Sequence, residues 1–434
     1  MAAFSKAGAK VLHFFDIRKY FVKKSSFIVI FLSLVTGLVA QTYTRVYNEN
    51  IRTLRVERMA LVLDNGVVDG SDPENTLHIS FDEMSHDVHF YTYSVLMLQS
   101  DLLSNEYLNG FTTQDIPDYM HSINTSREYT HYWFDFPNED MVLTKSGNYR
   151  LTVYEDGNPD NKVAEVDFCV VEPMVKTDAK VRANTDIEFS GRYQQLDLDI
   201  RTEALDVRDP NEVRVVVMQN NRTDNAVTLT QPTFFEPQRL RYVNNKALIF
   251  EGGNEYHHFD AFSCFYAGTG IDRVHHEMGD YHAILFPNEI TEGQYIHEFD
   301  SDGRYVVNAE RTADSDTEAE YMWVYWTLPV EQPWFDGALY IGGDIFQNQM
   351  TMRNRMQYDN EAKCYWLTAL VKQGGYDYQY WFVPKDQSKK TTIQRVDGSY
   401  WQTENEYAIY VYWRPFGARY DRLVGFSVIR SNAL

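Results

Sequence analysis

The chain has 434 residues, of which 62 are acidic and 40 are basic, so its formal net charge at pH 7 is -22. This length exceeds what one hydrophobic core usually serves, which predicts two or three domains. Binding of nucleic acid needs a concentrated basic surface, and because the sequence nowhere presents one, the charge argues against a nucleic-acid partner.

Residues 1–40 are typical of a secretory signal peptide. Lys23 and Lys24 precede an apolar run from Phe27 to Ala40. This run is shorter than the roughly 20 apolar residues that a membrane-spanning helix needs. We therefore expect a secreted protein, with cleavage between Ala40 and Gln41.

Short strand-like runs alternate with turn clusters through the rest of the chain. They lie at residues 77–81, 88–98, 162–171, 213–218, 281–286, 321–328, 407–413 and 422–429. Many short strands at regular spacing are typical of β-sandwiches, and a 15% content of aromatic residues favours strands over helix bundles. The sequence predicts an all-β fold of tandem immunoglobulin-like or early-set β-sandwich domains.

An aromatic segment, YTHYWFDF at 129–136, is followed by the turn formers Pro137-Asn138 and Ser146-Gly147-Asn148. Gly and Asn accept positive φ and Pro fixes its own φ, so this spacing predicts that the strand folds back on residues 149–154 as a hairpin.

Two interruptions of the apolar pattern predict the domain boundaries. Glu172-Pro173 is expected to end a first domain at 41–173. The stretch 329–333 is expected to separate a middle β domain at 174–330 from a C-terminal early-set sandwich at 331–434. From Trp334 onward the strand order resembles the early-set modules that include starch- and glycogen-binding domains.

Candidate metal motifs have the wrong spacing. The residues at 275–277 and His282 lack the two histidines four apart that a zincin helix needs. The acidic runs at 300–303 and 314–318 resemble fragments of calcium loops, but in the first run Gly303 comes too early for such a loop and no closing glutamate follows at the right place. We expect solvated turns at both runs, and no bound metal.

Signatures of catalysis are also missing. The sequence has no G-x-S-x-G elbow, no P-loop and no dinucleotide-binding loop. Cys169, Cys264 and Cys364 are too far apart for a disulfide framework or a zinc site. We therefore expect no enzyme, no cofactor and no small-molecule substrate, although a hydrolase with carboxylates from distant positions stays open as an alternative.

A row of aromatic residues supports a second alternative, an exported glycan-binding protein that uses the C-terminal module. The residues are Trp366, Tyr376, Tyr378 and Tyr380. The three tyrosines share one face of a strand by its period of two, and aromatic faces can stack on sugars.

Several motifs carry a family resemblance. The segments EYLNGF at 106–111, SxNTSREYTHYWFDFPNED at 122–140 and SGNYRLTVY at 146–154 resemble the first domain of type IX secretion system plug proteins. The likeness continues in order through QPTFFEPQRLRY, FEGGNEYHHFD, AEYMWVYWTLP, LVKQGGYDYQYWF and TENEYAIYVYWRPFGARYDRLVGF, at 231–242, 250–260, 319–329, 370–382 and 403–426.

The resemblance implies a structural role for the matching motif positions. They are Asn109, Gly110, Asn124, Thr125, Tyr129, Tyr132, Gly147, Asn148, Tyr149, Gly253, Asn254, Glu255 and Asp260. It also implies a non-enzymatic periplasmic plug that docks on the large outer-membrane barrel of the translocon and occludes its pore when the channel is idle. Such a protein would meet the membrane only through this partner.

Overall fold

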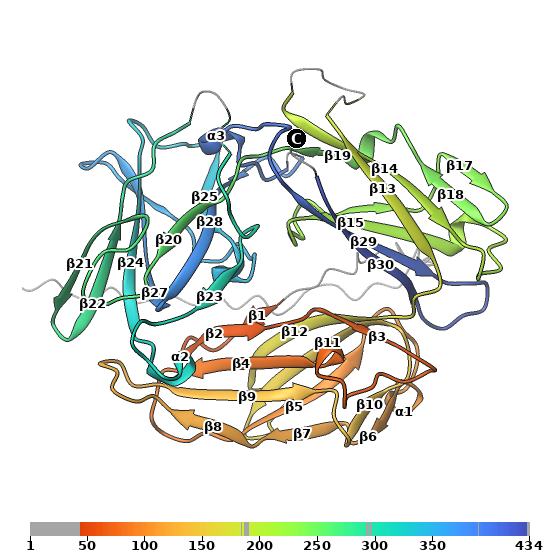
Figure 1. The fold of residues 1–434 in the computed structure, drawn as a ribbon, viewed down its shortest axis with the longest axis horizontal. Coiled ribbons are helices and arrows are strands. Elements are labelled where there is room, and N and C mark those ends of the chain that lie inside the picture. Colours follow the sequence, from red (N-terminus) through yellow and green to blue (C-terminus); the bar gives the residue numbers. More distant parts are fainter. Residues whose placement is uncertain are drawn as a thin grey trace, which may run out of the picture. The chain divides into compact units, whose positions relative to one another are not determined.

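The computed structural model describes residues 44–183, 185, 191–291, 295, 297–388 and 390–431. The expected signal peptide at 1–40 and the expected cleavage site between Ala40 and Gln41 lie outside these residues. Strands dominate the described part, and the few helices in it are single short turns (Figure 1). None of these helices has the length and apolar character needed to cross a bilayer. The expected all-β class with tandem sandwiches is confirmed.

The first sandwich spans β1 to β12. One sheet has the order β1-β12-β11-β5-β7, with β3 parallel to β12, and the other has the order β2-β4-β9-β8. The bounds are β1 Arg45–Val46, β2 Ile51–Val56, β3 Ala60–Val62, β4 Leu77–Glu83, β5 Tyr91–Met97, α1 Ser104–Tyr107, β6 Leu108–Gly110, β7 Thr113–Ile116, β8 Asp118–His121, β9 Thr130–Phe136, β10 Met141–Leu143, β11 Gly147–Glu155 and β12 Lys162–Val171.

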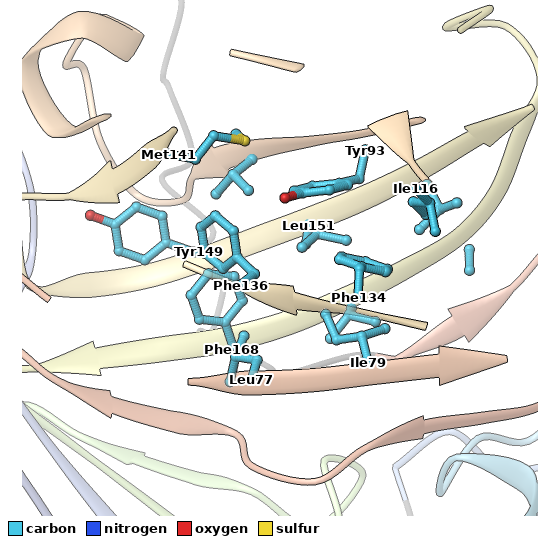
Figure 2. Packing of buried hydrophobic residues seen from close by; sticks show 14 of the residues in the cluster. Leu77, Ile79, Tyr93, Ile116, Phe134, Phe136, Met141, Tyr149, Leu151 and Phe168 are labelled. Atoms are coloured by element: carbon cyan, nitrogen blue, oxygen red, sulfur yellow. The ribbon is translucent and has the colours of Figure 1, made fainter. Parts of the chain in front are cut away.

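Aromatic rings from both sheets fill the core of the first sandwich (Figure 2). Tyr93 of β5 stacks on Phe134 of β9 at 4.5 Å between ring centroids, and Tyr149 of β11 stacks on Phe168 of β12 at 5.5 Å. Each buried ring removes a large apolar area from water, and the contact between Tyr93 and Phe134 helps to hold the two sheets together because it crosses between them.

The predicted hairpin between residues 129–136 and 149–154 is wrong. β9 pairs with β4 and β8, whereas β11 pairs with β5 and β12 in the other sheet. The intervening β10 pairs with β6 and carries the chain from one sheet to the other. The turn residues therefore mark a crossover between sheets, which the local sequence does not distinguish from a hairpin.

The second sandwich combines strands that are distant in sequence. One sheet has the order β13-β14-β18-β17 with β19 beside β14, and the other has the order β16-β15-β29-β30. The bounds are β13 Lys176–Arg182, β14 Tyr193–Arg201, β15 Val213–Gln219, β16 Val227–Leu229, β17 Phe234–Glu236, β18 Arg239–Tyr242, β19 Ile249–Glu251, β29 Glu406–Trp413 and β30 Arg422–Arg430.

The third sandwich lies between β19 and β29 in the chain. One sheet has the order β20-β28-β23 with β25 beside β28, and the other has the order β21-β22-β24-β27-β26. The bounds are β20 His257–Asp260, β21 Ile271–Glu277, β22 Asp280–Leu285, β23 Tyr305–Val307, α2 Ser315–Glu318, β24 Tyr321–Pro329, β25 Gly337–Gly342, β26 Gln357–Asp359, β27 Cys364–Lys372, β28 Gly374–Pro384 and α3 Gln394–Asp397. Single 3₁₀ turns occupy Pro73–Asn75, Pro210–Glu212, Lys246–Leu248 and Asp344–Phe346.

The expected boundary between 330 and 331 does not separate two sandwiches. β15 pairs with β29 from Val213–Trp413 to Gln219–Tyr407, which places the dark blue end of the chain beside the green strands of the second sandwich (Figure 1). β24 pairs with β27 up to Pro329 and Cys364, so the proline-rich stretch after β24 borders this sheet and is not a linker. Residues 331–434 are thus divided between two sandwiches and form no C-terminal module. The local pattern of a strand does not show which distant strand it pairs with. The strands up to residue 171 differ, because they pair only with one another, within the first sandwich.

Candidate functional site

The motif loop between β8 and β9 contacts the third sandwich. The backbone N–H of Ile123 donates to Thr317 O at 2.9 Å, and that of Ser126 donates to the Glu320 carboxylate at 2.6 Å. The Tyr129 hydroxyl donates to Ala319 O at 2.9 Å. Asn124 takes a left-handed φ of 60°, which suits Asn, and Thr125 closes the loop by donating to Ser122 Oγ at 2.8 Å. We call this contact the first joint.

A buried charge pair lies next to the same joint. Lys372 Nζ, at the end of β27, donates to Asp82 Oδ2 of β4 at 2.6 Å and to Asp316 O at 2.6 Å. His131 Nδ1 lies 2.6 Å from the other Asp82 oxygen, and the Tyr321 hydroxyl donates to Asp82 Oδ2 at 2.6 Å. The side chains of Lys372 and Asp82 are each 1% exposed. Three donors therefore satisfy a carboxylate that water does not reach.

The electrostatics identify this cluster as a structural connection between two sandwiches. Burial by itself would raise the pKa of Asp82, but Lys372 and His131 outweigh it and hold that pKa below its usual value. Burial lowers the pKa of Lys372. Burial and the charge of Asp82 raise the pKa of Tyr321 well above its usual value, so Tyr321 keeps its proton and serves as a donor. A buried carboxylate with all its donors in place stabilises the packing and is poorly placed to accept a proton from a substrate.

The FEGGNEY motif forms a second joint, between the second and third sandwiches. Gly253 O accepts hydrogen bonds from Thr403 Oγ1 and Tyr400 N, each at 2.8 Å. A Cβ at Gly252 would lie 2.1 Å from Tyr400 O, and Gly253 has a left-handed φ of 70°. Both positions therefore need glycine, because the two backbones approach closely.

Side chains of the same motif extend the second joint. Asn254 Nδ2 donates to Asp397 O at 3.0 Å, and the Glu255 carboxylate accepts from the Tyr295 hydroxyl. Asp260, at the end of β20, lies 2.8 Å from His258 Nε2. Burial raises the pKa of Glu255, with Asp300 adding to the effect.

A third joint connects the first and second sandwiches. Asn148 Oδ1 of β11 accepts from the Tyr412 hydroxyl of β29 at 3.0 Å, and a Cβ at Gly147 would lie 3.1 Å from Asp421 O. Arg422 donates to Glu172 at 2.7 Å across the same region. The remaining motif residues support the first sandwich itself. Tyr132 and Tyr149 are buried in its core, and Asn109 and Gly110 lie on β6, where a Cβ at Gly110 would meet Asp140 O at 1.9 Å.

Most of the motif residues at these joints were predicted from the sequence, whereas Asp82 and Lys372 were not. Neither lies in a segment that was predicted as a strand, and the usable signal was a charge at the end of an apolar run, ISFDE for Asp82 and LTALVK for Lys372. Such a charge indicates either an exposed face or a buried partner, and sequence alone does not decide between them.

The aromatic row proposed for sugar binding is part of the core. Tyr376, Tyr378 and Tyr380 are 2%, 3% and 0% exposed, and Tyr376 stacks on Phe259 at 5.2 Å. Only Trp366, at 39%, presents an exposed surface among the four residues. The predicted glycan-binding face is therefore wrong, because neighbouring strands and rings cover the tyrosines. No cluster of three or more His, Cys, Asp or Glu side chains suited to a metal ion occurs within the described residues.

Part of the chain matches a known protein family. The family model for the type 9 secretion system plug protein 1st domain matches residues 51–172, which form the first sandwich except for its first strand. The crystal structure of a hypothetical protein from Parabacteroides merdae is 35% identical, covers 90% of this chain and 100% of its own, and superposes with a TM-score of 0.85.

Two further solved structures, each 8% identical, give no likeness of fold. A biofilm-associated protein BSP domain (covering 91% of this chain and 61% of its own) has a TM-score of 0.17. Dimeric latent PorU from Porphyromonas gingivalis, which covers 90% of this chain and 34% of its own, has a TM-score of 0.13. No curated protein matches the chain. By this match the first sandwich is a type 9 secretion system plug protein 1st domain, which associates the chain with type 9 secretion.

Proposed function

We propose that this protein is a non-enzymatic periplasmic plug that docks on the large outer-membrane barrel of the type 9 translocon and occludes its pore when no substrate is passing. The match of residues 51–172 to the plug family carries this proposal. The motifs that resemble the family support it too, because several of them form joints between sandwiches. A pore wide enough for folded proteins leaks small solutes unless a body of comparable width covers it.

The first sandwich offers large apolar side chains for docking. Leu96 on the outward face of β5 is 57% exposed, and Phe111, just before the neighbouring β7, is 64% exposed. Leu103, which precedes α1, is 68% exposed. Reversible interfaces pair a small apolar centre with a polar rim, and a net charge of -22 keeps the free protein soluble.

Conductance of the isolated translocon in a planar bilayer tests occlusion directly. We expect the purified protein, added on the periplasmic side, to close the open channel in a concentration-dependent way. The double variant Leu96→Asp/Phe111→Asp should weaken closure about tenfold or more, since a charge in the apolar centre must be desolvated on docking. Phe416→Asp, at a fully exposed position of the second sandwich, is the matched control and should close the channel like the parent.

The outcomes separate the proposal from its rivals. An open channel that ignores the protein at any concentration overturns occlusion. If the Leu96→Asp/Phe111→Asp variant closes the channel as well as the parent does, occlusion is supported but docking through this part of the first sandwich is refuted. Release of the block by raised salt would show that the acidic surface contributes to docking.

A further inference from the structure

A cavity of about 330 Å³ lies between β2 of the first sandwich and β27 of the third. Arg52 and Thr53 of β2 form one side, the consecutive residues 367–372 of β27 form another, and the loop from Ile345 to Arg355 completes it. This volume is at the lower end of the range of about 300–1,000 Å³ that is typical of small-molecule sites. The family motifs at the joints do not account for this space.

The cavity carries positive charge in a chain that is otherwise acidic. Arg52, Arg353 and Arg355 all line it, and none of them forms an ion pair with a carboxylate in the described part of the chain. Arg52 Nη1 donates to Ile51 O and Arg353 Nη2 to Asn48 O, each at 3.0 Å. One turn, at residues 48–51, therefore holds two guanidinium groups at the cavity.

Burial disfavours the charge of both guanidinium groups, and Glu49 acts in the opposite direction on both. Burial lowers the pKa of Arg353, and the neighbouring charge of Arg52 lowers it further. Burial likewise lowers the pKa of Arg52. An anion between the two would remove this repulsion and use N–H donors that the turn leaves free, and guanidinium groups match carboxylates in geometry.

The rest of the lining combines aromatic and aliphatic side chains with the polar side chains of Gln347, Gln357 and Thr368, and it includes a strand edge that is paired on one side. Trp323, Phe346 and Trp366 supply aromatic surface. β26 pairs with β27 only at Cys364–Trp366, so residues 367–372 have a strand partner on one side only in the described structure. Six consecutive residues of β27 border the cavity. A strand face would present only every second residue, so the cavity lies along the edge of the strand. Such an edge presents backbone N–H and C=O groups that an extended peptide can pair with.

We propose that this cavity binds an apolar carboxylate with an adjacent amide, which is the chemistry of the C-terminal residue of an extended polypeptide. Arg52 and Arg353 hold the carboxylate, Trp323 and Trp366 contact the apolar side chain, and the edge of β27 pairs with the amide. The site is independent of occlusion by the plug.

Calorimetric titration of the full protein with N-acetyl-leucine, N-acetyl-phenylalanine and N-acetyl-tryptophan, each beside its carboxamide, tests this proposal. We expect at least one acid to bind about tenfold or more tightly than its amide, because only the acid forms charge-assisted hydrogen bonds. Arg353→Gln and Arg52→Gln should each remove most of this preference. Arg208→Gln, at an exposed arginine paired with Asp206, should leave it unchanged.

Naphthalene-2-carboxylate, which has no amide, tests the strand edge. Weaker binding than that of the best N-acetyl amino acid supports pairing with β27, whereas equal binding overturns the chain-end assignment. No difference between acids and amides overturns the site altogether, and so does an unchanged preference in both Arg52→Gln and Arg353→Gln. An unchanged urea midpoint shows that each variant is folded.

Discussion

Replacing Lys372 with Met should lower the free energy of unfolding more than breaking an exposed ion pair does, because it weakens the first joint. The ammonium group contacts Asp82 and Asp316 O at 2.6 Å each and lies 4.3 Å from the centre of the Tyr129 ring. Removing one partner of a buried pair leaves an uncompensated charge, at a cost of about 3–5 kcal/mol. His131 and Tyr321 still face Asp82 at 2.6 Å, so we expect the lower end, about 3 kcal/mol.

Urea unfolding followed by tryptophan fluorescence and by circular dichroism measures this loss, and coincident transitions allow one free energy to be assigned. Lys363→Met is the matched control. Lys363 pairs with Glu331 at 2.7 Å, close to the 2.6 Å between Lys372 and Asp82. Both side chains of the control pair are exposed, which predicts a loss of about 1 kcal/mol or less. In the double variant Asp82→Asn/Lys372→Met the losses should fall short of additivity by about 1–3 kcal/mol. Equal losses for Lys372→Met and Lys363→Met would refute the reasoning.

Three further changes test other parts of the structure. Burial, with Asp300 and Glu406 nearby, raises the pKa of Asp302 to about 7, so its contribution to stability is present below the unfolded pKa and is lost as pH rises through about 7. Asp302→Asn should therefore raise the melting temperature at about pH 8 and flatten its fall between about pH 5 and pH 8, and a steeper fall would contradict the assignment. Tyr378→Ala should cost about 3–5 kcal/mol in urea unfolding, because the ring is 3% exposed in the core, and near-parent stability would contradict this packing. Gly252→Ala should lower the melting temperature strongly, since its Cβ would lie 2.1 Å from Tyr400 O. Gly279→Ala is the control and should lower it less, because Gly279 has open space around it and only its φ of 92° strains an alanine.

The sequence predicted the fold class well and the connectivity poorly. Runs such as VRVVVM and YAIYVYW were correctly read as strands, because short apolar runs rich in β-branched and aromatic residues between turn residues are typical of strands. Their pairing with each other as β15 and β29 was missed, since about 190 residues separate them and no local signal reports it. The same limit explains the wrong boundary after residue 330 and the wrong hairpin after Phe136.

The site shows a similar division. Gly253 and Asn254 were identified through the motif, and two adjacent glycines in an otherwise apolar stretch already indicate close backbone approach. Tyr376, Tyr378 and Tyr380 were placed on one strand face, which is correct, but burial of that face depends on β20 and β23, which pair with β28 from distant positions. Burial of a strand face is a property of its neighbours, so a single strand's pattern leaves core and binding surface indistinguishable.

Placement of the motifs at joints connects this structure to the proposed function. Segments around residues 123–129, 317–321 and 372 lie far apart in the chain and meet at the first joint through a charge pair, backbone hydrogen bonds and a ring contact between Tyr129 and Tyr321. Polar contacts of this kind specify one orientation, because a shifted arrangement leaves buried donors and carboxylates unpaired. An enzyme family shares residues that touch a substrate, whereas a protein that acts by covering an opening requires a fixed relation between its parts. Variants that loosen the first joint should therefore lower the efficiency of channel closure even where the docking residues Leu96 and Phe111 are unchanged.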